Sequence, residues 1–210
     1  MKKILFVLLL GLGLVTLSAC TSQTKDVSEN NANKSVSLTD GTYQVSTSSS
    51  KVAWKASKVV GNSHTGTLAI KSGNLTITGG NLTGGNLLLD MKSIKTDENI
   101  EALVKHLNSE DFFATETYPE ANLVITSVAR TPEEGLYAIS GDLTLKGKTA
   151  PISFNLMLNQ ENNKVLAVSE LELDRTTWDV RYGSGKFFQD LGDKVIKDEI
   201  DLSVSLEAIK

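Results

Sequence analysis

Side chains able to do covalent or metal chemistry are few in this 210-residue sequence and lie far apart along it. It contains one cysteine, Cys20, and two histidines, His64 and His106. Neither histidine has a His-x-His or Glu-x-x-His spacing, and a single thiol does not complete a zinc ligand set. We therefore predict no metal site and interpret both histidines as loop or packing residues.

Nucleophiles and phosphate-binding loops are also not indicated. Ser184 lies between two glycines but lacks the strand-elbow-helix setting of a hydrolase nucleophile. The carboxylate pair Glu133-Glu134 is typical of a solvated surface. The glycine pairs 79–80 and 84–85 have no following helix that could bind phosphate, so we interpret them as turns. We predict no enzyme and no cofactor; His64 is the only reasonable base if the protein does act on a lipid.

Cys20 is different because of the residues that precede it. A positively charged start is followed by an apolar run at 4–15 that is too short to span a bilayer comfortably. Residues 17–20, Leu-Ser-Ala-Cys, resemble a bacterial lipobox, in which the cysteine is lipidated and the chain is cut before it. We expect residues 1–19 to be a lipoprotein signal peptide and Cys20 to carry acyl chains that hold the protein on a membrane. An uncleaved anchor helix or an ordinary secretory signal is the alternative.

The mature chain is expected to be a tether followed by one domain. Residues 20–40 are mostly Ser, Thr, Asn, Lys and Asp without aromatic side chains, which predicts a flexible tether. Residues 41–210 are long enough for one domain. Thr21 stands where an aspartate would resemble an inner-membrane retention signal, so we expect the outer membrane, facing the periplasm. The net charge of −4 falls to −6 when the two leader lysines are removed, which argues against a nucleic acid partner.

Alternation of apolar and polar residues dominates the domain and predicts strands. It is clearest near the end, where Asp198 is the only charge on the apolar face of the segment 196–208. Eight to ten strands are predicted, and short connections between them require antiparallel pairing. Turn sequences separate them at Ser72-Gly73-Asn74, Gly79-Gly80-Asn81, Gly84-Gly85-Asn86, Lys146-Gly147-Lys148 and Glu161-Asn162-Asn163.

One segment has helical spacing. Ile100, Leu103, Val104 and Leu107 fall at i, i+3, i+4 and i+7, which predicts an amphipathic helix near 97–108 with Asp97 as its N-cap. A single helix covers an open sheet or seals one end of a barrel. The number and length of the strands favour a closed all-β barrel, whose interior is either packed or left as a cavity for a small apolar ligand. The aromatic content of 6% weakly favours a cavity.

Longer segments occur in a characteristic order: Trp54 to Lys58, His64 to Thr67, His106 to Phe113, Tyr118 to Ala121, Gly141 to Gly147 with Pro151, and Leu173 to Trp178. Together they resemble the YceI-like family from about Thr42 to Ala208. The resemblance implies an extended antiparallel, lipocalin-like barrel of the bacterial envelope that holds an isoprenoid-type or other long-chain amphiphile. At Leu123 the family commonly has an aromatic residue, so the pocket shape and the identity of the lipid stay open.

Strand parity and the resemblance together predict a membrane-tethered lipid-binding module. The resemblance implies that Phe112 and Phe113 pack as a structural lid, and direct contact with the ligand is the alternative. Arg175 is expected to pair with Asp174, and the alternative is that it reaches a ligand head group. The predicted polar contacts near an opening are His64, Arg175 and Tyr182. The predicted wall residues are Trp54, Leu68, Ile70, Leu89, Ile139, Phe154, Leu156, Leu171, Trp178, Leu202 and Val204.

The predicted partners are a long-chain lipid or isoprenoid ligand, of isoprenoid, quinone or fatty-acid type, and a membrane held through acylated Cys20. Storage or transport of the ligand is the expected role, and a homodimer is left open. The rival interpretation is a packed barrel that acts as an interaction or stress protein without a lipid ligand.

Overall fold

The structure is a computed structural model that describes residues 38–210, so the predicted signal peptide, Cys20 and most of the predicted tether lie outside the described residues. Within that range the chain forms nine strands, one α-helix and two short 3-10 helices. In chain order they are β1 Gly41–Val45, β2 Lys51–Lys58, β3 Ser63–Thr78, β4 Asn81–Thr96, α1 Glu101–Asn108, β5 Glu120–Arg130, β6 Leu136–Leu145, β7 Lys148–Glu161, β8 Lys164–Asp174, η1 Arg175–Trp178, η2 Gly192–Lys194 and β9 Ile196–Ile209.

Eight of these strands close into an antiparallel barrel. The order around it is β3, β2, β9, β8, β7, β6, β5 and β4, and β4 pairs again with β3. The ninth strand, β1, continues the position of β2: β2 pairs with residues 63–68 of β3, and β1 pairs with residues 74–77 of the same strand. The predicted extended, lipocalin-like antiparallel barrel with one helix is therefore confirmed.

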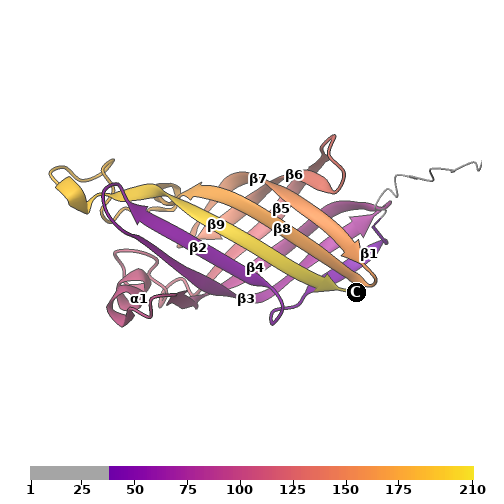
Figure 1. The fold of residues 1–210 in the computed structure, drawn as a ribbon, viewed down its shortest axis with the longest axis horizontal. Helices are drawn as coiled ribbons and strands as arrows, with labels where there is room; N and C mark the ends of the chain where they lie inside the picture. Colours follow the sequence, from indigo (N-terminus) through magenta and orange to yellow (C-terminus); the bar gives the residue numbers. More distant parts are fainter. Residues whose placement is uncertain (1–37) are drawn as a thin grey trace, which may run out of the picture. The chain divides into compact units, whose positions relative to one another are not determined.

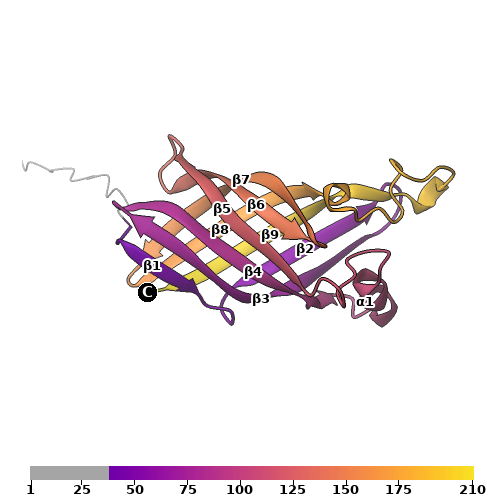
Figure 2. The ribbon, with the colours of Figure 1, turned by 180° about the vertical axis from the view of Figure 1, so that it is seen from behind.

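The two ends of the barrel are built differently (Figures 1 and 2). One end carries α1, the turn between β2 and β3, and the segment 175–195 that joins β8 to β9; we call it the helix end. The other end carries β1 and the C-terminus, and we call it the terminal end. The strands run between the two ends at a slant, as expected for a closed barrel.

Two glycine sequences that predicted turns lie inside long strands instead. The segment 72–74 belongs to β3 and the segment 84–86 belongs to β4, so both turn predictions are wrong. A Cβ atom on Gly85 would lie 2.4 Å from the carbonyl oxygen of Asn74 on the neighbouring strand. Glycine at this position allows β3 and β4 to lie close together, because a side chain would push the two strands apart. The predicted turn at 79–80 does form, with positive φ at both glycines.

The helix is shorter than predicted and starts differently. It begins after Ile100, whose backbone N–H donates to Oγ1 of Thr96 at 3.0 Å. Asp97 is not its N-cap, because its carboxylate accepts a hydrogen bond of 2.7 Å from Oγ1 of Thr65 in β3. The apolar side of α1 is confirmed: Leu107 is buried in a cluster at the helix end. Asp97 thus ties the segment between β4 and α1 to β3 and does not cap the helix.

Apolar clusters fill both ends of the barrel. The cluster at the terminal end includes Leu38, Tyr43, Ile77, Leu82, Leu158, Val165 and Ala208. The cluster at the helix end includes Trp54, Met91, Ile94, Leu107, Phe112, Phe113 and Val180. Phe112 and Phe113 are both buried, as expected of a structural lid. Between these clusters many inward-facing residues are only half-buried, which marks unfilled space in the middle of the barrel.

Substitution of Gly66 in β3 tests how tightly the side chains at the helix end are packed. A Cβ atom there would overlap the carbonyl oxygen of Lys95 and lie 2.6 Å from Cζ2 of Trp54. We expect Gly66→Ala to lower the free energy of unfolding by about 1–3 kcal/mol, the usual cost of overpacking. Urea denaturation measures it. The matched control is Gly84→Ala, because nothing lies within 4 Å of a Cβ atom at Gly84. Equal unfolding midpoints for the two variants would contradict this assignment.

Candidate functional site

The candidate site is an apolar lumen formed by two adjoining cavities. The middle cavity has a volume of about 90 Å³ and reaches Leu75 and Leu206 on the side of the terminal end. The helix-end cavity has a volume of about 130 Å³ and reaches Phe112 and Phe113. Both cavities share wall residues, which are Leu89, Ala121, Leu143, Leu173 and Leu202. They are therefore successive sections of one lumen that runs along the barrel.

The walls are apolar because of strand alternation. Inward positions of the strands carry Leu, Ile, Val, Phe and Trp, and every second side chain faces solvent. The polar residues that border the middle cavity are Asn86 and Ser169, and Arg175 borders the helix-end cavity. Such a surface holds a ligand by excluding water from apolar area.

Most of the predicted wall residues line the lumen. They are Trp54, Leu68, Leu89, Phe154, Leu156, Leu171, Trp178, Leu202 and Val204. Ile70 and Ile139 are buried in the cluster at the terminal end and line neither cavity. Contact of all these residues with a ligand stays a prediction.

The predicted polar contacts lie apart from one another. His64 is on β3, where its Nδ1 lies 3.6 Å from Oε1 of Glu98. Tyr182 packs its ring against His106, with ring centroids 4.6 Å apart, and its side chain is exposed. Neither His64 nor Tyr182 lines a cavity, whereas Arg175 does. The three residues therefore do not form one polar opening.

Several lining residues were missing from the predicted wall. Ile152, Leu173, Ile200 and Leu206 follow the same strand parity as the predicted residues, so the alternation alone could have found them. Val180 also lines the helix-end cavity but lies in the connection after η1, where no period marks a buried face.

The barrel wall is incomplete between β7 and β8. Paired residues join Met157–Glu161 of β7 to Lys164–Val168 of β8, and this pairing stops toward the helix end. One side-chain hydrogen bond follows, from Oγ of Ser169 to the carbonyl oxygen of Asn155 at 2.7 Å. Beyond it, both edges of the gap carry apolar residues that line the lumen: Ile152 and Phe154 on β7, and Leu171 and Leu173 on β8. We call this stretch the β7/β8 seam.

Trp178 of η1 fills the seam nearest the helix end. Its indole Nε1–H donates to the carbonyl oxygen of Leu143 in β6 at 2.9 Å. Its ring packs with Leu143 and Ala150, and the side chain is buried. Pro151 lies in the part of β7 that has no paired residue on β8, and an unpaired strand edge is a place where proline is tolerated.

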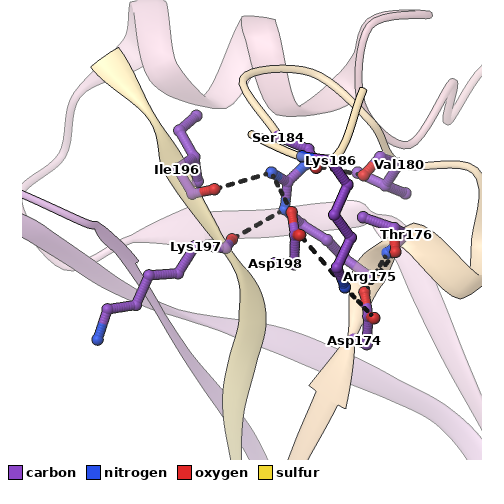
Figure 3. A network of polar contacts seen from close by, with 9 residues as sticks. All are labelled: Asp174, Arg175, Thr176, Val180, Ser184, Lys186, Ile196, Lys197 and Asp198. Carbon is purple, nitrogen blue, oxygen red and sulfur yellow. Dashed lines mark hydrogen bonds and ion pairs between the residues drawn. The ribbon is translucent and has the colours of Figure 1, made fainter. Parts of the chain in front are cut away.

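Arg175 is held by a buried polar network at the helix end (Figure 3). Its guanidinium donates to the carbonyl oxygens of Val180, Lys197 and Ile196 at 2.7, 3.1 and 3.3 Å, respectively. Its ion pair is with Asp198 of β9 at 3.4 Å. The expected pairing with Asp174 is therefore wrong. In an extended chain Asp174 and Arg175 point to opposite faces, whereas Asp198 points inward from β9.

Lys186 fastens the connection between β8 and β9 to the same network. Its Nζ lies 2.8 Å from Oδ2 of Asp174 and 3.3 Å from Oδ2 of Asp198. Oγ of Ser184, which is fully buried, accepts the backbone N–H of Lys186 at 3.2 Å. Burial lowers the pKa of Arg175, and the neighbouring Asp198 opposes that shift. The network thus neutralises Arg175 at the edge of the apolar lumen.

Membrane-spanning helices and metal sites were sought within the described residues. No helix within 38–210 is long and apolar enough to cross a membrane. In the same range no group of three His, Asp or Glu side chains is arranged to hold a metal ion.

The YceI-like domain model matches residues 43–208, which is most of the chain and nearly all of the barrel. The chain belongs to the YceI-like family. A UPF0312 protein of Photorhabdus laumondii is 33% identical over 120 residues, which cover 57% of this chain and 60% of that relative.

Two solved structures of other proteins have a similar fold. BcnA of Burkholderia cenocepacia matches with a TM-score of 0.64 at 22% identity and covers 78% of this chain and 99% of its own. A polyisoprenoid binding domain from Saccharophagus degradans, implicated in plant cell wall breakdown, matches with a TM-score of 0.63 at 18% identity and covers 80% and 97% of the two chains.

Asp174 makes the network sensitive to acid. Burial alone would raise the pKa of this carboxyl, but hydrogen bonds from Lys186 and Thr176 outweigh burial and lower the pKa. A carboxylate with a lowered pKa stabilises the fold above its unfolded pKa of about 3.9, and this contribution is lost as the pH falls through the folded value. We expect Asp174→Asn to lower stability at pH 7 and to flatten its decline below about pH 4.

Urea unfolding between pH 7 and pH 3 measures this effect. The control is Asp142→Asn, because Asp142 is an exposed carboxyl on β6 outside the network. An Asp174→Asn variant with the same acid dependence as the parent protein would show that the carboxylate contributes nothing there.

Proposed function

We propose that this protein binds a long-chain amphiphile of isoprenoid, quinone or fatty-acid type inside its barrel, for storage or transport. The observation that carries the proposal is the apolar lumen, which continues from the middle cavity into the helix-end cavity. The description of the Saccharophagus degradans neighbour as a polyisoprenoid binding domain supports it.

Binding by such a lumen rests on desolvation. Apolar surface removed from water contributes about 25 cal/mol per Å², so a long chain can bind tightly after the costs of ordering are met. No covalent step is needed, and the proposal is of a binding protein that is not an enzyme. The one charged side chain lining the described lumen, Arg175, already has its guanidinium hydrogen-bonded to three carbonyl groups and Asp198.

Substitution of lumen residues tests the binding function. Leu202 borders both cavities and Phe154 lies at the seam. We expect Phe154→Arg and Leu202→Arg each to abolish retention of co-purifying lipid, because a guanidinium placed in an apolar lumen must stay solvated and excludes the chain. Native mass spectrometry of the purified domain detects the bound mass, and circular dichroism checks the fold.

The matched control is Val168→Arg, because Val168 is exposed on β8 and points out of the barrel. Lipid retained by both lumen variants would refute the assignment of the lumen. A parent protein without any co-purifying mass, and without uptake of added lipid, would instead favour a barrel that acts through its outer surface.

We also propose that the protein is an envelope lipoprotein, anchored through acylated Cys20 in the outer membrane and facing the periplasm. The lipobox-like residues before Cys20 and the threonine after it support this location. The partner in this case is the membrane itself, which two or more acyl chains hold stably.

The anchor is tested by Cys20→Ser in the bacterial host. We expect the parent protein to fractionate with membranes and to begin at an acylated Cys20, and the variant to carry no acyl chain and to keep residues 1–19, because the cut before residue 20 follows lipidation of the thiol. Mass spectrometry of the N-terminal peptide identifies the lipid. A parent protein whose first residue is not an acylated Cys20 would contradict the proposal.

A further inference from the structure

Exposed apolar side chains gather at the helix end of the barrel. Val59 and Val60, in the turn between β2 and β3, are the most exposed large apolar residues among residues 38–210, at 59% and 58%. All exposed Phe and Tyr side chains of that range are also at the helix end, and they are Tyr118, Tyr182, Phe187 and Phe188. Away from this end, the exposed large apolar residues are isolated on strands: Val124, Val168 and Ile209. Such clustering marks a binding surface.

Two neighbouring loops carry most of this surface. The turn between β2 and β3 is bonded to the connection between β8 and β9, because the backbone N–H of Val59 donates to the carbonyl oxygen of Val195 at 2.9 Å. This connection, drawn in gold, projects beyond the ends of the strands in both views (Figures 1 and 2). We use the name loop-tip patch for the exposed apolar residues of the two loops, which are Val59, Val60, Tyr182, Phe187 and Phe188.

The loop-tip patch lies close to the lumen. The connection that carries it includes Val180, which lines the helix-end cavity. The ring of Tyr182 packs against the ring of Phe112, with centroids 5.2 Å apart, and Phe112 lines the same cavity. One segment of chain therefore covers the lumen with some of its side chains and exposes apolar side chains to solvent with others.

We propose that the loop-tip patch docks the barrel on the surface of a lipid bilayer. Aromatic rings are favoured at the interface between a membrane and water. Five side chains at two loop tips can insert among lipid head groups, whereas a stable protein interface takes about 20–30 residues from each side. The inference rests on the proposed function and adds the surface at which the amphiphile is exchanged, because a docked barrel takes up a long chain without exposing it to water.

The charges of the two loops permit approach to lipid phosphates. Cations outnumber carboxylates in residues 58–62 and 181–195, although the chain as a whole has a net charge of −4. The charged residues of these two ranges are Lys58, Arg181, Lys186, Lys194, Asp190 and Asp193. Arg181 and Lys186 form ion pairs with Asp179 and Asp174. The loops therefore carry no free basic cluster, and the apolar side chains must supply most of the attraction.

The point at which the chain enters the barrel is compatible with docking on the membrane that holds the proposed anchor. Leu38 belongs to the cluster at the terminal end, opposite the loop-tip patch. Cys20 precedes Leu38 by 18 residues, which span at most about 60 Å when fully extended. The 16 residues of β3, which run between the two ends, rise about 50 Å. An acylated Cys20 thus leaves the patch within reach of the same membrane, where even a weak contact forms because linkage raises the local concentration.

Quenching of an added tryptophan by brominated phospholipid tests the docking directly. Gln189 is exposed beside Phe188, and Asn163 is exposed in the turn between β7 and β8 at the terminal end. The mature full-length protein is mixed with vesicles of phosphatidylethanolamine and brominated phosphatidylglycerol and recovered by flotation. We expect Gln189→Trp to add fluorescence that the bromolipid quenches, and Asn163→Trp to add fluorescence that it does not quench. High salt should leave the quenching largely unchanged, because exposed charges are screened and apolar contacts are not.

An unquenched indole at position 189 in vesicle-bound protein, or quenching that high salt abolishes, would overturn the inference. Protein that does not float with the vesicles would overturn it as well. A protein surface would then be the better candidate for the occupant of the loop-tip patch. Native mass spectrometry decides the lumen separately, so co-purifying lipid together with an unquenched indole refutes the docking and leaves the proposed lipid binding in place.

Removal of the two exposed phenyl rings tests the role of the loop-tip patch. We expect Phe187→Ser/Phe188→Ser, combined with Gln189→Trp, to weaken the docking equilibrium roughly ten- to hundredfold, because two rings no longer leave water. The matched control is Val124→Ser/Val168→Ser, which removes two exposed apolar side chains from the strands and should leave the quenching unchanged. Circular dichroism checks the fold of both double variants. Equal quenching in the two would contradict the assignment of the patch.

Discussion

Closure of the sheet into a ring is the constraint on which the rest of the structure depends. Once β4 pairs again with β3, every strand has an inward face, and alternation decides which side chains it receives. The inward side chains can fill the two ends, where Leu38 and Phe112 belong to different clusters. Between these clusters they leave a lumen, because a ring of eight strands encloses slightly more space than its side chains occupy.

A polar network at the edge of an apolar lumen needs complete pairing. Removing one partner of a buried ion pair leaves an uncompensated charge, which is far more costly than the pair itself. Arg175 meets this condition through three backbone carbonyls and Asp198, and Lys186 neutralises the remaining oxygen of Asp198. The same contacts hold the connection from β8 to β9 against the barrel. The buried charge of Arg175 therefore helps to fix the backbone at the helix end.

The strands and their inward faces could be predicted from the sequence, because alternating apolar and polar side chains indicate which face of a strand is buried. The places of the glycine segments 72–74 and 84–86 could not be predicted, since glycine suits both a turn and a close approach of two strands, and only the register of β3 against β4 distinguishes the two. The partner of Arg175 was also missed. Its signal was the single charge, Asp198, on the apolar face of the last strand, but joining residues 23 positions apart requires the pairing of β8 with β9.

The β7/β8 seam has a consequence for how the barrel moves. Where neighbouring strands are paired, widening the ring means breaking the backbone hydrogen bonds between them. Along the seam no paired residues hold Ile152 and Phe154 of β7 to Leu171 and Leu173 of β8, so these edges can separate at the expense of side-chain contacts alone. Backbone amides there should exchange with solvent sooner than those of β6 or β9, and the barrel can breathe locally without unfolding.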